Sequence, residues 1–136
     1  MSALSGTAAS LRLFGDDLNP DEVTRLLGKE PNAAERRGDV QPSGRIARWG
    51  RWSVKIERRA PGDLDGQIVE LLAGTTEDIA VWQHLTSVYN ADVFCGLFLQ
   101  EENEGIYVFP QTLRLLGERG IKLHLDIYAP DREADD

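Results

Sequence analysis

The segment from Arg45 to Trp52 holds the densest group of side chains that could bind another molecule. It combines Arg45, Arg48 and Arg51 with Trp49 and Trp52. Arginine and tryptophan are the side chains that most often anchor protein interfaces, and guanidinium groups also hold phosphates or carboxylates. We therefore take Arg48, Trp49 and Arg51 as candidate binding residues. A core tryptophan with arginines laid over it would explain the same composition, and a single nucleic-acid strand could also stack there.

Two further groups are candidates for contact with a partner. His124 and Asp126 alternate on one face of an expected strand and are the only nominees for an acid–base pair. An acidic turn supplies three more candidates, Glu101, Glu102 and Glu104. A solvated strand face and a solubilising surface would show the same residues, so each group keeps a purely structural alternative.

Motifs that would carry catalysis are missing from the sequence. There is no glycine-rich phosphate loop after a strand, no Gly-x-Ser-x-Gly turn and no pair of Cys or His at metal spacing. The single cysteine, Cys95, lies inside an apolar run, where we expect a buried structural thiol rather than a nucleophile. The sequence thus predicts a protein that is not an enzyme and that uses no cofactor and no metal.

Charge is distributed unevenly along the 136 residues, which carry a net charge of −8. The first 60 residues hold 11 Lys and Arg against 8 Asp and Glu, whereas the remainder holds 4 against 15. This acidity makes nucleic acid an unlikely partner, because such binding neutralises phosphates with a broad basic surface. It suits instead a soluble protein that is attracted to a basic partner.

The length predicts one domain, with a structured core over about 8–129 and an acidic C-terminal tail over 130–136. No signal peptide and no apolar run long enough to span a membrane is found, so we expect a cytoplasmic protein without membrane contact.

The apolar run within Asp92–Gln100 is too short for an ordinary helix and predicts a strand that is covered on both faces. Its alternation places Phe94, Gly96 and Phe98 on one face. Around it we expect strands at 7–14, 47–57, 106–109 and 121–128, a loop at 32–45, and helices over 20–27, after Asp63, after Thr75 and from Pro110.

These elements predict an α+β fold, with a single sheet of four to five mostly antiparallel strands and three to four helices packed mainly on one face. Two helices that each contain Leu-Leu-Gly, at 26–28 and 115–117, suggest a ferredoxin-like pseudo-repeat, although chance similarity would produce the same echo.

A sheet covered on one side leaves an opposite face that collects polar residues around Phe94 and Phe98. Its expected members are Arg12, Arg51, Ser53, Lys55, Lys122, His124, Asp126 and Tyr128. Exposed aromatic rings indicate contact with something, either a foreign protein or a second copy in a homodimer. Alternatively, the loop at 32–45 folds over the rings. Trp49 joins this face by strict alternation, unless Gly50 marks a bulge that returns it to the core.

The order of the motifs resembles the bacterial family catalogued as domain of unknown function 4279. The likeness is carried by Leu11 to Leu18, by the stretch Asn19 to Pro31, by the Trp52-Ser53 strand and by the closing Asp126-Ile127-Tyr128. The family has no established activity or catalytic residues that the resemblance could transfer. Small acidic members of such families look like immunity proteins, which mask a bacterial toxin, and many such toxins are basic.

The resemblance therefore implies a protein-binding role, with another protein such as a basic toxin domain as the partner. A module that senses a small molecule or nucleotide through the Arg and Trp segment 45–52, with the long loop as a lid, is the alternative. A small enzyme is the third and weakest option.

Overall fold

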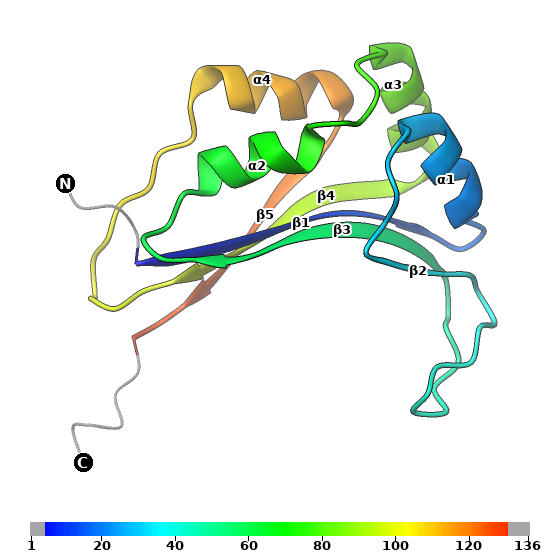
Figure 1. Ribbon diagram of the computed structural model, residues 1–136, viewed down its shortest axis with the longest axis horizontal. Helices are drawn as coiled ribbons and strands as arrows, with labels where there is room; N and C mark the ends of the chain where they lie inside the picture. The colour runs from blue at the N-terminus through cyan, green and yellow to red at the C-terminus, as the bar shows by residue number, and fades with distance from the viewer. Residues whose placement is uncertain (1–4, 131–136) are drawn as a thin grey trace.

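The fold consists of one five-stranded sheet and four helices, which cover one face of the sheet (Figure 1). The computed structural model describes residues 5–130. The strands are β1 (Gly6–Gly15), β2 (Ala33–Glu35), β3 (Gly50–Arg59), β4 (Asn90–Phe98) and β5 (Lys122–Tyr128), and the helices are α1 (Pro20–Leu27), α2 (Leu64–Leu72), α3 (Ile79–Val88) and α4 (Pro110–Arg119).

The strand order is β2-β3-β1-β4-β5. Only the β4–β5 pair is parallel, and the other three pairs are antiparallel. The predicted α+β class, with a mostly antiparallel sheet and helices on one face, is confirmed. The suggested repeat is not found in the strand pairing, because β1 and β2 on either side of α1 do not pair with each other, whereas β4 and β5 on either side of α4 are parallel neighbours.

The core lies between the helices and the face of the sheet that they cover. Leu11 and Leu13 of β1, Trp52 of β3 and Val93 of β4 are fully buried there, because alternate side chains of a strand point to the same face. Cys95 is buried on the same side, as expected for a structural thiol. Desolvation by this burial, helped by the nearby Asp92 carboxylate, raises the pKa of Cys95 to about 12.

Helix α1 begins and ends where the sequence predicts. Asn19 caps it by accepting hydrogen bonds from the amides of Asp21 and Glu22, at 3.0 and 3.4 Å. Pro20 occupies the first turn, and Gly28 ends the helix at a φ of 75°. These local signals agree with the helix bounds, and at the C-terminal end the Leu27 carbonyl also accepts a hydrogen bond from the Thr76 amide at 2.8 Å.

Two segments differ from the sequence prediction. The expected loop at 32–45 contains the short strand β2, which pairs with β3, and continues as a hairpin in which Val40 pairs with Ile46. The hairpin extends beyond the end of the sheet (Figure 1). Residues 106–109, predicted as a strand, instead lead from the end of β4 to α4 as an irregular segment. A short apolar run does not distinguish a strand from a segment that packs beside a helix.

A bulge in β3 changes which side chains share a face. Thr7 pairs with Arg59 whereas Ala9 pairs with Ile56, so Glu57 and Arg58 together lie opposite the single residue Ala8. An extra residue shifts the alternation by one, and Arg58 thereby joins the face away from the helices.

In the described part of the chain no helix is long and apolar enough to cross a membrane.

Candidate binding surface

The face of the sheet away from the helices is the surface on which most of the candidate residues meet, and we call it the open face. Its members are Glu35 of β2, Arg51, Ser53, Lys55, Glu57 and Arg58 of β3, Ser10, Arg12 and Phe14 of β1, Asn90, Asp92, Phe94, Gly96 and Phe98 of β4, and Lys122, His124, Asp126 and Tyr128 of β5.

One row of side chains crosses the open face from Arg58 through Phe98 to Tyr128. The Arg58 guanidinium carbon lies 4.1 Å from the Phe98 ring centroid, and the Phe98 and Tyr128 rings are stacked with centroids 4.8 Å apart. Gly6 pairs with Phe98 and the Arg58 side chain passes over it, since a Cβ at Gly6 would lie 2.7 Å from Arg58 Nε. The missing side chain at Gly6 therefore lets Arg58 reach across β1.

A second row crosses the face from Arg12 through Phe94 to His124. The Arg12 guanidinium carbon is 4.4 Å from the Phe94 centroid, and the Phe94 and His124 rings meet edge to face at 4.8 Å. The two rows repeat because Phe94 and Phe98, like His124 and Tyr128, are four residues apart and so point to the same side. Each row consists of a cation, a phenylalanine ring and a second ring.

The Asp92 carboxylate anchors the second row. Its oxygens accept from Arg12 Nε and Nη2 at 2.8 and 2.7 Å, and His124 Nδ1 lies 3.7 Å from Oδ2. Only 6% of the Asp92 side chain is exposed, compared with 30% for Arg12. The hydrogen bonds that Arg12 donates to this buried carboxylate raise the pKa of Arg12. The guanidinium is thus held in place before any partner arrives.

The open face is close to neutral, although the protein as a whole is acidic. Five Lys and Arg face four Asp and Glu there, whereas the full chain carries a net charge of −8. The excess of acid therefore lies on residues outside the open face. This distribution follows from the fold, because residues that are far apart in the sequence supply both signs to the open face.

Trp49 lies at a corner of the sheet, just before β3, with 43% of its surface exposed. It lines a hollow of about 400 Å³ together with Phe14 and Val88, and a second of about 500 Å³ together with Arg45 and Arg48. Trp52 is fully buried, and its Nε1 donates to Thr24 Oγ1 at 3.0 Å. Trp49 is thus not returned to the core, but it lies beside the sheet rather than among the residues of the open face.

Arg51 is half-buried on β3, with its Nε 3.7 Å from Glu35 Oε1. That nitrogen is buried and has no hydrogen-bond partner among the described residues. The other oxygen of Glu35 accepts from Gln41 Nε2 at 2.7 Å. Arg51 therefore belongs to the open face, whereas Arg48 lies outside it on the hairpin.

The acidic turn lies beyond the end of β4 and is organised around Glu104. The Glu104 carboxylate accepts from the amide and hydroxyl of Ser5 and from the amides of Gln100 and Glu101, at 2.6 to 3.0 Å. The Ser5 hydroxyl and these amides together lower the pKa of Glu104 to about 2. Glu104 thus holds the turn against the start of β1, and of the three glutamates Glu101 and Glu102 are exposed whereas Glu104 is partly buried.

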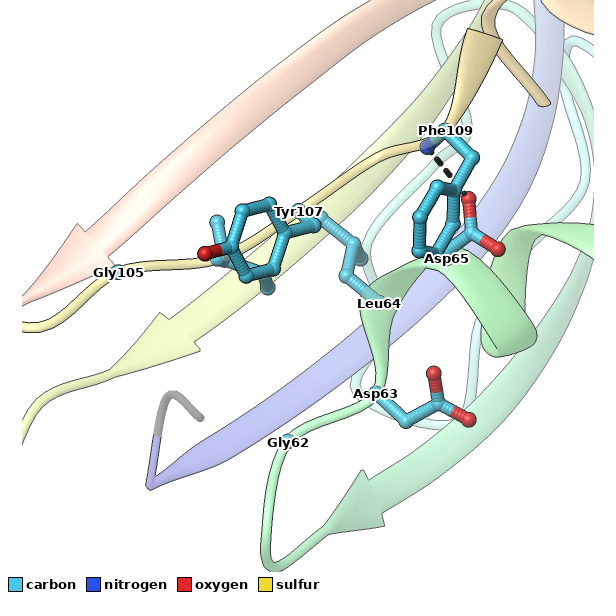
Figure 2. A pocket seen from close by; sticks show the side chains of 8 residues that line it. Gly62, Asp63, Leu64, Asp65, Gly105, Tyr107 and Phe109 are labelled. Carbon is cyan, nitrogen blue, oxygen red and sulfur yellow. Dashed lines mark hydrogen bonds between the residues drawn. The ribbon is translucent and has the colours of Figure 1, made fainter. Parts of the chain in front are cut away.

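A small pocket on the helix side was not predicted by the sequence (Figure 2). It has a volume of about 150 Å³ and lies between the start of α2 and residues 105–109. Asp65 accepts a hydrogen bond from the Phe109 amide at 2.9 Å, and Asp63 caps α2 by accepting from the Gly66 amide. Both carboxylates therefore accept hydrogen bonds from backbone amides. Figure 2 shows Asp63 at the start of α2.

A family model described as a domain of unknown function, DUF4279, matches residues 5–130. The chain belongs to this family. No curated protein and no solved structure matches it. The match covers both rows of the open face in this DUF4279 protein, as well as the segment around Trp49.

The structure brings Arg51, His124 and Asp126 of the predicted set together on the open face of the DUF4279 fold, with Trp49 and Arg48 at one end and the acidic turn at the other. Sequence reasoning missed Arg58 because the predicted strand ended at Glu57, whereas β3 continues to Arg59 and its bulge places Arg58 on the open face. It also missed Asp92 as a site residue, because a carboxylate just before an apolar run is usually interpreted as an exposed residue at the end of a strand. Within residues 5–130 no three His, Cys, Asp or Glu side chains are grouped as metal ligands would be.

Proposed function

We propose that this DUF4279 protein is a protein-binding module that docks its partner on the open face and carries out no catalysis. The observation that carries the proposal is the pair of rows in which Arg12 and Arg58 lie on phenylalanine rings. Arginine and aromatic side chains supply much of the binding energy in protein interfaces. Side chains that are ordered before binding lose less conformational entropy when the partner docks.

A hollow at the end of the first row gives a partner side chain somewhere to insert. It has a volume of about 360 Å³ and is lined by Arg58, Phe98, Gln100 and Tyr128, among others. Hot-spot residues of interfaces commonly fill such pockets. The open face therefore combines flat aromatic contact area with one recess.

The geometry favours a protein over a single strand of nucleic acid. Both faces of the Phe98 ring are already occupied, one by Arg58 and the other by Tyr128, so no base can stack on it without displacing them. The near-neutral charge of the open face also offers no broad basic surface for phosphates.

An immunity role, in which the partner is a bacterial toxin in the cytoplasm, is the specific form of this proposal that the family resemblance suggested. The net charge of −8 supports it, because an acidic protein associates faster with a basic one. Since the open face is near neutral, Glu101 and Glu102 would steer the approach while the aromatic rows make the contact. Reversing both charges should then slow association with a captured basic partner and weaken its salt dependence.

A small-molecule module is the second candidate, and the observation in its favour is the pair of hollows beside Trp49. Arg45 and Arg48 would hold an acidic group, and the indole would contact an apolar part of the ligand. A rise in melting temperature with nucleotides or acidic metabolites that is lost in Trp49→Ala would support this candidate over the first.

The decisive experiment is affinity capture from the native host, followed by measurement of the dissociation constant for the captured protein with two matched variants. Tyr128→Ala removes a ring of the open face that is 47% exposed, and Tyr107→Ala removes a ring of the helix side that is 62% exposed. We expect at least a tenfold loss of affinity for the first variant and little change for the second. Equal affinities would remove the open face as the docking surface.

A further inference from the structure

Strand β5 is the longer of the two outer strands, with seven residues compared with three in β2. Its pairing with β4 runs without a shift from Lys122 to Tyr128. An outer strand presents unpaired backbone groups, and proteins commonly protect such an edge with a proline, a bulge or a very short strand. None of these three devices occurs within β5, and its one lysine, Lys122, is the first residue of the strand, so the edge from Leu123 onward is suited to pairing with another strand.

The outward backbone groups belong to Leu123, Leu125 and Ile127. The Tyr128 carbonyl accepts a hydrogen bond from the Leu99 amide at 3.1 Å and so points toward β4. Because these groups alternate along a strand, those of Leu123, Leu125 and Ile127 point away from the sheet. Leu123 packs against the core, but Leu125 and Ile127 are 44% and 60% exposed. An open edge therefore coincides with exposed apolar side chains.

We propose that two copies of the chain pair through β5, antiparallel and about a twofold axis at Leu125. Each Leu125 would then face its counterpart, and Leu123 of one copy would face Ile127 of the other. All three residues direct their amides and carbonyls outward, so each facing pair exchanges two hydrogen bonds. Two five-stranded sheets would join into one continuous sheet.

The side chains favour a second copy as the occupant because β5 is complementary to itself in this register. His124 of one copy faces Asp126 of the other, and Lys122 faces Tyr128, which gives an imidazole–carboxylate contact and a cation–ring contact on each side of the axis. Moving the axis by one residue to Asp126 would place two carboxylates opposite each other. An isologous contact requires self-complementarity of this kind.

Pairing through β5 goes beyond the proposed function and does not rest on it. The open faces of the two copies would become continuous across the axis, because the sheet continues from one β5 to the other. In this register the row that ends at His124 would face Asp126 of the second copy, and the row that ends at Tyr128 would face Lys122. A dimer would present one wide surface rather than two separate ones.

The first test measures the molar mass of the purified full chain by light scattering, from low micromolar to hundreds of micromolar concentrations. We expect twice the 15.1 kDa of one chain for the wild type. Ile127→Lys places a charge at the edge and should give a folded monomer. Val88→Lys changes a residue of the same exposure, 59% against 60%, at the end of α3 rather than on β5, and should remain a dimer.

The second test addresses the register by forming a disulfide between copies. Facing residues of a hydrogen-bonded pair have Cα atoms about 5.5 Å apart, within the range of a disulfide, so Leu125→Cys should give a covalent dimer under mild oxidation. The two Ile127 positions would lie four residues apart along the strands, about 13 Å, so Ile127→Cys should not. The natural Cys95 is buried and does not interfere.

The two cysteine variants also distinguish specific pairing from random collision. Ile127 is more exposed than Leu125, so random collision would cross-link Ile127→Cys faster, whereas the proposed register cross-links Leu125→Cys. A monomeric mass for the wild type at every concentration would overturn the proposal. A dimer that survives Ile127→Lys, or cross-linking at Ile127→Cys as fast as at Leu125→Cys, would overturn it as well.

Discussion

The guanidinium carbon of Arg58 lies 4.1 Å from the ring centroid of Phe98, although strand β1 separates the two strands that carry these residues. Three features of the chain make the contact. The β3 bulge turns Arg58 onto the open face, Gly6 leaves its path clear, and Tyr128 supports the far side of the ring. The arrangement is therefore a property of four strands together.

Adding a methyl group at Gly6 should displace Arg58 while leaving the fold intact. The new Cβ would meet the far end of a flexible side chain, so we expect Gly6→Ala to change the free energy of unfolding by less than about 1 kcal/mol. The upfield ring-current shift of the Arg58 side-chain protons in an NMR spectrum should disappear. As a control, Gly50→Ala places its Cβ 2.3 Å from the Leu18 carbonyl oxygen and should destabilise strongly. A retained Arg58 shift in Gly6→Ala would contradict this account.

The two tryptophans near the start of β3 should differ sharply in their contribution to stability. Trp52 is fully buried, and its replacement by alanine should cost about 3 to 5 kcal/mol. Trp49 is 43% exposed, so Trp49→Ala should change the free energy of unfolding by about 0.5 kcal/mol or less. Urea denaturation of both variants measures the difference. Equal destabilisation would show that Trp49 belongs to the core.

Removing Arg12 from the Arg12–Asp92 ion pair should lower the free energy of unfolding more than removing Asp92. Arg12→Ala leaves a nearly buried carboxylate without its two donors, at a cost of about 2 kcal/mol, whereas Asp92→Ala leaves a guanidinium that can turn toward water. The double variant should lose less stability than the sum of the single ones. Chemical denaturation of the three variants measures this coupling, and strict additivity would show that the pair contributes nothing beyond its separate residues.

The acidic turn should make stability depend on pH below the ordinary range of a carboxyl group. The folded state lowers the pKa of Glu104 from 4.5 to about 2, so the unfolded chain binds this proton more readily. The stability that Glu104 contributes is therefore complete above pH 4.5 and is lost as the pH falls toward 2. The difference in urea midpoint between the wild type and Glu104→Gln should narrow over that window. A constant difference would show that Ser5 and the turn amides do not hold the carboxylate ionised.

Local signals allowed several elements to be predicted from the sequence. Asn19, Pro20 and Gly28 defined α1 because capping and φ preferences act within a few residues. The alternation of β1, β3, β4 and β5 separated the covered face from the open one, and the central apolar run indicated that Cys95 is buried. Arg12 of β1, Phe94 and Phe98 of β4 and the polar residues of β5 could be assigned to the open face for the same reason, since side chains alternate along any strand.

Strand order, pairing partners and the bulge were decided only by the tertiary structure. The sequence does not state that β1 lies between β3 and β4, so it could not place Arg12 on Phe94 or Asp92 beneath Arg12. The bulge moved Arg58 to the opposite face, and the extent of the helix layer left Leu125 and Ile127 exposed. Periodicity reports the local direction of a side chain, whereas contacts between strands depend on long-range packing that the periodicity does not record.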